Sequence, residues 1–203
     1  MTPVYRISYE APPFDGREAL RYAGCREASG DMQALLDECW RIAEPVLTYR
    51  LCYRELPLSM MGDECDIGGH RVRSASLAGH LAGCRRVILL AATVGLPLDR
   101  LIAREGRLSP ARGLMLQAIG AERIEAICDR FSAETERRMQ EAGLCCRHRF
   151  SPGYGDLPLA FQAELFSLLD CERAIGLTLT GSGLMSPTKS VTAIIGLAEQ
   201  ELL

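Results

Sequence analysis

The stretch Val87-Ile88-Leu89-Leu90-Ala91-Ala92-Thr93 decides the fold of this chain of 203 residues. It is a nearly continuous apolar run of strand length, which is typical of a central strand buried on both faces of a sheet. Upstream, Leu47 to Tyr53 alternates apolar with polar residues and therefore predicts a half-buried strand. Strands with this alternation occur mostly in antiparallel sheets, because one face of such a sheet is often left to solvent. The two stretches together predict a mainly antiparallel sheet.

Helical signals lie on both sides of these strands. Asp15 caps a predicted helix that runs to about Tyr22, and Glu18 completes a capping-box pattern three residues later. The longest predicted helix runs from Pro110 to about Ala142. Its buried side is assigned to Leu114, Ile119, Ile124, Ile127, Phe131 and Met139.

The remaining elements complete a mixed pattern. Further helices are predicted from Asp31 to Pro45, around Ser76 to Leu81, from Pro97, and near Leu159 to Leu169. Further strands are predicted for Pro3 to Tyr9, Leu177 to Thr180 and Ser190 to Ile195, the last two as a closing pair. This mixture favours a single α+β domain, residues 1–203, in which a mainly antiparallel, twisted sheet is flanked by helices.

Composition narrows the class of protein. The net charge of −3 gives no electrostatic reason to expect nucleic acid or an anionic membrane as a partner. The N-terminus carries no secretory signal pattern, and the longest apolar run, Val87 to Leu96, is too short to cross a bilayer. Nine cysteines without a C-x-x-C pair indicate reduced thiols. We therefore expect a cytoplasmic protein without nucleic-acid or membrane partners.

The hexapeptide Arg149-Phe150-Ser151-Pro152-Gly153-Tyr154 predicts a cradle for a small ligand. Arg149 offers two parallel N–H donors to a carboxylate. Pro152 restricts the backbone, and Gly153 lets a ligand approach the main chain closely. Tyr154 offers a ring to an adenine or a sulfonium cation. The alternative is a surface turn with a solvated arginine.

The order of motifs after Arg149 resembles the activation module of cobalamin-dependent methionine synthase. The Arg-x-Ala-Pro-Gly-Tyr segment of that family stands here as Arg149 to Tyr154, with Ser151 in place of alanine. The family's Leu-Asp-x-Glu element is matched by Leu169-Asp170-Cys171-Glu172. Its next element is matched by Gly176, Leu179, Thr180, Ser182, Met185, Pro187, Ser190 and Val191.

A looser likeness extends upstream. Ala91 to Gly95 and Gln117 to Glu125 resemble elements of free-standing members of the family. The resemblance divides the domain into a helical and strand part, about 1–85, and a part that carries the cradle, about 86–203.

The resemblance implies that the cradle binds S-adenosylmethionine. Arg149 would hold the ligand's carboxylate and Glu125 its ammonium group, with Glu122 as a rival for the second role. Ser151 and Gly153 would offer main-chain contacts, and Tyr154 would flank the nucleoside. The implied ligand residues are Arg149, Ser151, Pro152, Gly153, Tyr154 and Glu125, with no catalytic residue and no metal ligand.

The resemblance also implies a role in the reductive remethylation of cobalamin, in trans, with a corrinoid-dependent methionine synthase or a related methyltransferase. The chain would be a component of that enzyme rather than a complete enzyme, with a flavodoxin-like protein as electron donor. The sequence lacks the Asp-x-His-x-x-Gly signature of cobalamin-binding domains, so the partner would carry the cobalamin.

Three departures leave alternatives open. No tyrosine follows Tyr154, Gly143 stands where long family members have an acidic residue, and the acidic residue that they carry near their N-terminal edge has no clear counterpart here. A docking subunit that binds no S-adenosylmethionine is therefore one alternative. An autonomous methyltransferase is another, although the usual glycine-rich strand-to-helix loop is missing. Cys145, Cys146 and His148 adjoin the cradle, but adjacent cysteines seldom chelate one ion, so packing is favoured there over metal binding.

Overall fold

The computed structural model describes residues 2–25 and 29–199 and is built around a seven-stranded antiparallel sheet. The strand order is β4-β3-β2-β5-β9-β6, and β1 pairs with the first part of β2. The strands are β1 (Tyr5–Tyr9), β2 (Tyr49–Met61), β3 (Glu64–Ile67), β4 (His70–Arg73), β5 (Cys84–Thr93), β6 (Leu144–Cys146) and β9 (Ser190–Glu199). A separate hairpin is formed by β7 (Thr178–Leu179) and β8 (Met185–Ser186).

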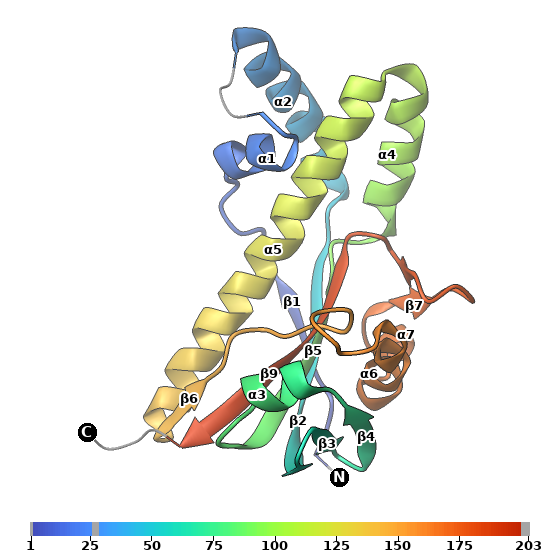
Figure 1. The fold of residues 1–203 in the computed structure, drawn as a ribbon. Helices are drawn as coiled ribbons and strands as arrows, with labels where there is room; N and C mark the ends of the chain where they lie inside the picture. Colours follow the sequence, from blue (N-terminus) through green and yellow to red (C-terminus); the bar gives the residue numbers. More distant parts are fainter. Residues whose placement is uncertain (1, 26–28, 200–203) are drawn as a thin grey trace.

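Helices cover both faces of the sheet. α5 crosses the molecule diagonally, α1, α2 and α4 gather around its first half, and α3, α6 and α7 lie on the other side of the sheet (Figure 1). The helices are α1 (Gly16–Tyr22), α2 (Gly30–Ala43), α3 (Ala75–His80), α4 (Leu96–Leu108), α5 (Pro110–Glu141), α6 (Gln162–Leu169) and α7 (Cys171–Ile175), with short 3-10 turns at Glu44–Val46 and Leu159–Phe161. The predicted α+β class with a mainly antiparallel sheet is confirmed.

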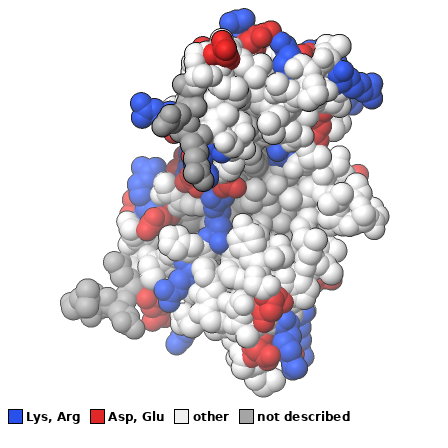
Figure 2. All heavy atoms as spheres, turned by 45° about the horizontal axis from the view of Figure 1, so that its top comes forward, with Lys and Arg blue, Asp and Glu red and all other residues white. Residues whose placement is uncertain are grey.

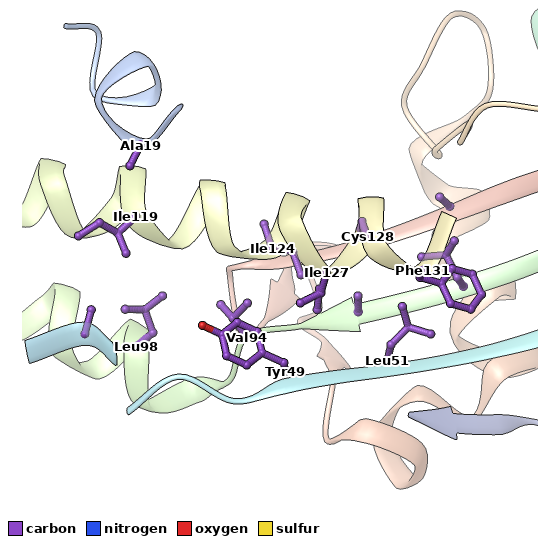
Figure 3. Packing of buried hydrophobic residues seen from close by; sticks show 14 of the residues in the cluster. Ala19, Tyr49, Leu51, Val94, Leu98, Ile119, Ile124, Ile127, Cys128 and Phe131 are labelled. Carbon is purple, nitrogen blue, oxygen red and sulfur yellow. The ribbon is translucent and has the colours of Figure 1, made fainter. Parts of the chain in front are cut away.

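The strand β5 lies at the centre of the sheet and separates two apolar cores. Ile88, Leu90 and Ala92 pack in the core beneath α5, whereas Val87, Leu89 and Ala91 pack in the core beneath α6. The prediction of a strand buried on both faces is therefore confirmed. In Figure 3, Ile124, Ile127 and Phe131 of α5 point toward the sheet, in which β2 carries Tyr49 and Leu51.

Two predictions about exposure were wrong. The stretch Leu47 to Tyr53 was expected to be half-buried, but β2 continues to Met61 and buries Cys52 on its second face, because α7 packs there. Leu114 was assigned to the buried side of the long helix, but it is 56% exposed. The other five assigned residues of that helix are buried, so the helical period was correct and only Leu114 was assigned to the wrong side.

The predicted closing pair of strands was also wrong. β7 pairs with β8 in a hairpin of its own, and β9 inserts between β5 and β6 in the large sheet. The apolar pattern identified the strands but not their partners, because strand pairing joins segments that are far apart in the sequence. The chain passes from β3 into β4, and α3 follows β4.

The N-terminal turn is anchored to α5 by a buried arginine. Arg123 is fully buried and donates hydrogen bonds of 2.7 Å each to the carbonyl oxygens of Pro12 and Pro13. Its charge is paired with the neighbouring carboxylate of Glu122. The stacked rings of Phe14 and Trp40 cover the guanidinium, with ring centroids 5.1 and 5.5 Å from its carbon. This arrangement places α1 against the middle of α5.

The N-terminal cap of α1 lies beside this buried ion pair. Asp15 accepts hydrogen bonds from the amides of Arg17 and Glu18, as the capping pattern predicted. The reciprocal half of the capping box is absent, since the amide of Asp15 donates to Glu122 Oε1 at 3.2 Å and Glu18 pairs with Arg21 instead. Within the described residues, no helix is long and apolar enough to cross a membrane.

We expect Arg123→Met to lower the free energy of unfolding by about 3–5 kcal/mol, because the substitution leaves the buried Glu122 carboxylate without its partner. Urea denaturation measures the change. Arg21→Met is the matched control, since its ion pair with Glu18 is exposed and should contribute little. Equal urea midpoints of unfolding for the two variants would show that the ion pair of Arg123 with Glu122 does not anchor the N-terminal turn.

Candidate functional site

A cavity of about 490 Å³ lies between the second half of α5, the start of β9 and the segment 146–154. Its size falls within the usual range for small-molecule sites. The lining residues are Glu125, Asp129, Ser132 and Glu136 of α5; Cys146, Arg147, His148, Arg149, Ser151, Pro152 and Tyr154; Ser190, Val191, Thr192 and Ile195 of β9; and Gln162 and Met185.

The edge of the sheet positions the cradle segment. After β6, the amide of Arg147 still donates to Gly196 O at 2.8 Å, and Phe150 exchanges hydrogen bonds of 2.8 and 2.9 Å with Ile194. The Phe150 side chain packs against the core beneath α6. Because side chains alternate along an extended chain, Arg149 is directed to the opposite side, toward α5.

Two carboxylates of α5 hold the Arg149 guanidinium. Arg149 Nη2 donates to Glu125 Oε2 at 2.9 Å and to Asp129 Oδ1 at 2.6 Å. The two acceptors lie one helical turn apart, so they reach the same nitrogen. Burial acts to lower the pKa of Arg149, but the neighbouring Cys128, Glu125 and Asp129 raise it above its ordinary value. Arg149 is thus a fixed, permanently charged group at one end of the cavity.

The Pro-Gly-Tyr turn closes on itself. The amide of Tyr154 donates to Ser151 O at 3.0 Å, and the amide of Gly153 donates to Leu157 O at 2.9 Å. Gly153 has φ +93°, a conformation that favours glycine. Tyr154 is 59% exposed, and its ring meets that of Phe150 edge-on, with centroids 6.0 Å apart. The turn therefore presents an accessible aromatic face beside the cavity.

The first and the last turn of helix α3 are hydrogen-bonded to residues on either side of the cradle. At the first turn, Asp156 accepts hydrogen bonds from the Ser74 hydroxyl at 2.5 Å and from the amides of Ala75 and Ser76 at 2.8 and 3.0 Å. At the last turn, the His80 ring bonds through Nε2 to the carbonyl oxygen of His148 at 2.7 Å. The cradle is thereby fixed to a helix that comes from the other part of the chain.

The Asp156 cap has a testable consequence. The Ser74 hydroxyl, followed by the Ser76 amide, lowers the pKa of Asp156 to about 2. Because the pKa is lower in the folded protein, the stabilisation is present above the ordinary pKa of 3.8 and is lost as the pH falls toward 2.

We expect the Asp156 carboxyl signal in an NMR titration to have its midpoint near pH 2. We also expect Asp156→Asn to speed hydrogen exchange at the amides of Ala75 and Ser76, because both carboxylate oxygens of Asp156 accept hydrogen bonds there and an asparagine offers a single, uncharged acceptor oxygen. The Gly69 amide, which donates to Asp66 Oδ1, is the internal control and should be unaffected. An unchanged exchange rate at the α3 amides would contradict the role of Asp156.

The structure brings most of the predicted site residues together. Five of the six residues line the one cavity, namely Glu125, Arg149, Ser151, Pro152 and Tyr154. Gly153 shapes the turn but does not line the cavity. The rival Glu122 is engaged by Arg123 and lies in a neighbouring hollow.

Sequence reasoning missed the rest of the acidic stripe on α5. Asp129, Ser132 and Glu136 follow Glu125 at spacings of four, three and four residues, which place them on one helix face. That polar stripe on a helix whose other side is apolar was the available signal. The contribution of Thr192, from β9, had no such signal, because it depends on the strand order.

The cysteines beside the cradle do not form a metal site. Cys145 packs on the core beneath α6 and Cys146 on the core beneath α5, so the two thiols lie on opposite faces of β6. Burial, together with the charge of Glu136, raises the pKa of Cys146 to about 11, so this lining thiol is protonated at neutral pH. Among residues 2–25 and 29–199, no group of three histidine, cysteine or acidic side chains is arranged to hold a metal ion.

The comparisons with known proteins agree with this architecture. Residues 125–201 match the family model described as the activation domain of vitamin B12 dependent methionine synthase. The fold is similar to that in a crystal structure of the MetH reactivation domain bound to AdoHcy, with a TM-score of 0.70 and 16% identity over 99% of this chain and 80% of that chain. No curated protein matches the sequence. The expected resemblance to the activation-domain family is therefore confirmed for residues 125–201, and its fold for nearly the whole chain.

Proposed function

We propose that this chain is an S-adenosylmethionine-binding activation module that supports the reductive remethylation of cobalamin in a corrinoid-dependent methionine synthase or a related methyltransferase. The observation that carries the proposal is the cavity in which Arg149 and Glu125 lie side by side at one end, with Tyr154 in the same lining. An amino-acid group needs a cation for its carboxylate and an anion for its ammonium, and a nucleoside needs an aromatic face.

The residues of the cavity fit this ligand. Arg149 would hold the carboxylate and Glu125, which is 39% exposed, the ammonium group. Tyr154 would flank the nucleoside, and Pro152 would restrict the turn beneath it. The turn already uses Ser151 O and the Gly153 amide, and Gly153 does not line the cavity, so of the two residues expected to offer main-chain contacts we assign only the Ser151 N–H to the ligand.

The chain's own contribution would be positioning. S-Adenosylmethionine, when bound, supplies the methyl group that the corrinoid receives. Arg149, Glu125 and Tyr154 would orient that ligand, and holding two reactants in line is worth ~7–11 kcal/mol of an activation barrier. The one cavity thiol, Cys146, is protonated, and this favours a positioning role over nucleophilic chemistry.

A docking surface for the corrinoid partner would adjoin the cavity. Leu159 is 54% exposed beside the Gly153 turn, and Leu184 is 65% exposed next to the lining residue Met185. Acidic and basic side chains are interspersed over the face drawn in Figure 2. We propose that the module acts in trans on cobalamin carried by a partner, with electrons from a flavodoxin-like donor. Co-purification of the tagged chain with a corrinoid protein tests this step.

We expect the purified chain to bind S-adenosylmethionine in a calorimetric titration and Arg149→Ala to abolish the heat, because the ligand carboxylate then has no cation. Arg130→Ala is the matched control, since Arg130 pairs with Glu134 on the same helix and does not line the cavity. Full binding by Arg149→Ala would overturn the assignment of the cradle.

We expect Tyr154→Ala to weaken the binding of S-adenosylmethionine and S-adenosylhomocysteine by similar factors, on the order of 5- to 150-fold, because stacking of a base on an aromatic ring contributes about 1–3 kcal/mol. Tyr154→Phe should retain most of the affinity, since the ring is kept. A large loss in Tyr154→Phe would show that the hydroxyl, rather than the ring, recognises the ligand.

A docking subunit without a nucleoside ligand is the second candidate. The closed pairing of Arg149 with two carboxylates favours it, because the guanidinium already has partners. Absence of heat with the wild-type chain, together with co-purification of a corrinoid protein, would support this function. Release of S-adenosylhomocysteine in the absence of any corrinoid protein would instead support an autonomous methyltransferase.

A further inference from the structure

We propose that Asp129 is a specificity-determining residue: its carboxylate occupies the nitrogen of Arg149 that a ligand carboxylate requires, and the ligand must displace it. The inference rests on the proposed function of the cavity. It starts from the bond between Arg149 Nη2 and Asp129 Oδ1, which at 2.6 Å is the shorter of the two bonds that Nη2 makes.

The geometry of the guanidinium makes the competition direct. An arginine grips a carboxylate most strongly with two parallel N–H donors. The two forks that a guanidinium presents are Nε with Nη2 and Nη1 with Nη2, so each fork uses a hydrogen of Nη2. That nitrogen carries two hydrogens, and both Glu125 and Asp129 already accept from it. A ligand carboxylate can therefore accept two parallel hydrogen bonds from the guanidinium only if one of these acceptors leaves.

Asp129 is the acceptor that leaves more easily. Its side chain is 72% exposed, compared with 39% for Glu125 and 21% for Arg149. A carboxylate that is already largely hydrated exchanges its protein partner for water at little loss, and exposed ion pairs are weak. The less exposed Glu125 would remain to meet the ammonium group of the ligand.

In the protein without ligand, Asp129 would then occupy the position on Arg149 that the ligand carboxylate takes on binding. Ligands that carry an amino-acid group can displace it, because they present the same chemical group to the same nitrogen. A ligand that has only the nucleoside thioether cannot compete for Arg149 and does not depend on Asp129. The residue would thus lower the affinity for amino-acid ligands and leave the affinity for the nucleoside part unchanged.

The test compares the wild-type chain with Asp129→Asn by calorimetric titration against S-adenosylmethionine and against 5′-methylthioadenosine, which lacks the amino-acid group. We expect the variant to bind S-adenosylmethionine about three- to fivefold more tightly, the size of a weak exposed ion pair. Binding of 5′-methylthioadenosine should not change. Because Asp129 is exposed, the substitution should leave the thermal midpoint nearly unchanged.

Glu134→Gln is the matched control, since it removes the same charge from α5 at an exposed ion pair outside the cavity. An equal or weaker affinity of Asp129→Asn for S-adenosylmethionine would overturn the inference, and so would an equal gain in Glu134→Gln. Failure of both the wild type and Asp129→Asn to bind S-adenosylmethionine would overturn the proposed function and this inference together. Binding by Asp129→Asn alone would support the inference.

Discussion

The ion pair between Arg149 and the carboxylates of α5 is the interaction on which the site depends. It joins the edge of the sheet to a long helix, and it sets the charge at one end of the cavity. The arginine can hold this place because the backbone on each side of it is hydrogen-bonded to β9. The carboxylates can hold theirs because the opposite side of the same helix is packed in the core. Neither element would define the site without the other.

Two further anchors keep these elements in place, and both are charged groups that bond to the main chain. Arg123 binds the carbonyl oxygens of the N-terminal turn and brings α1 against α5. Asp156 binds the first amides of α3 and brings that helix against the cradle. The first is fully buried and the second lies at the surface, but the two have the same geometric role. Each joins segments that are more than seventy residues apart in the chain.

A large part of the fold could be predicted from local patterns. The sequence predicted correctly the strand from Val87 to Thr93 and the buried side of the helix from Ile119 to Met139. A strand buried on both faces is a continuous apolar run, and a helix buried on one face has apolar residues at helical spacing, so both can be recognised from the order of the residues. The pairing of β9 could not be predicted, since the residues of an apolar strand do not indicate which strand lies beside it. The same limit applied to the site. The motif from Arg149 to Tyr154 was visible, but its contact with Asp129 was not.

By itself, the sequence determined the α+β class, the central strand, the long helix and a turn with the chemistry of a small-ligand cradle. These features depend on the conformations that individual residues prefer and on the spacing of apolar side chains, which are local properties. Only the tertiary structure decided that Glu125 and Asp129 share one nitrogen of Arg149, that α3 braces the cradle, and that Thr192 faces the cavity. Those contacts arise from how the sheet and its helices pack, and packing is determined by the whole chain at once.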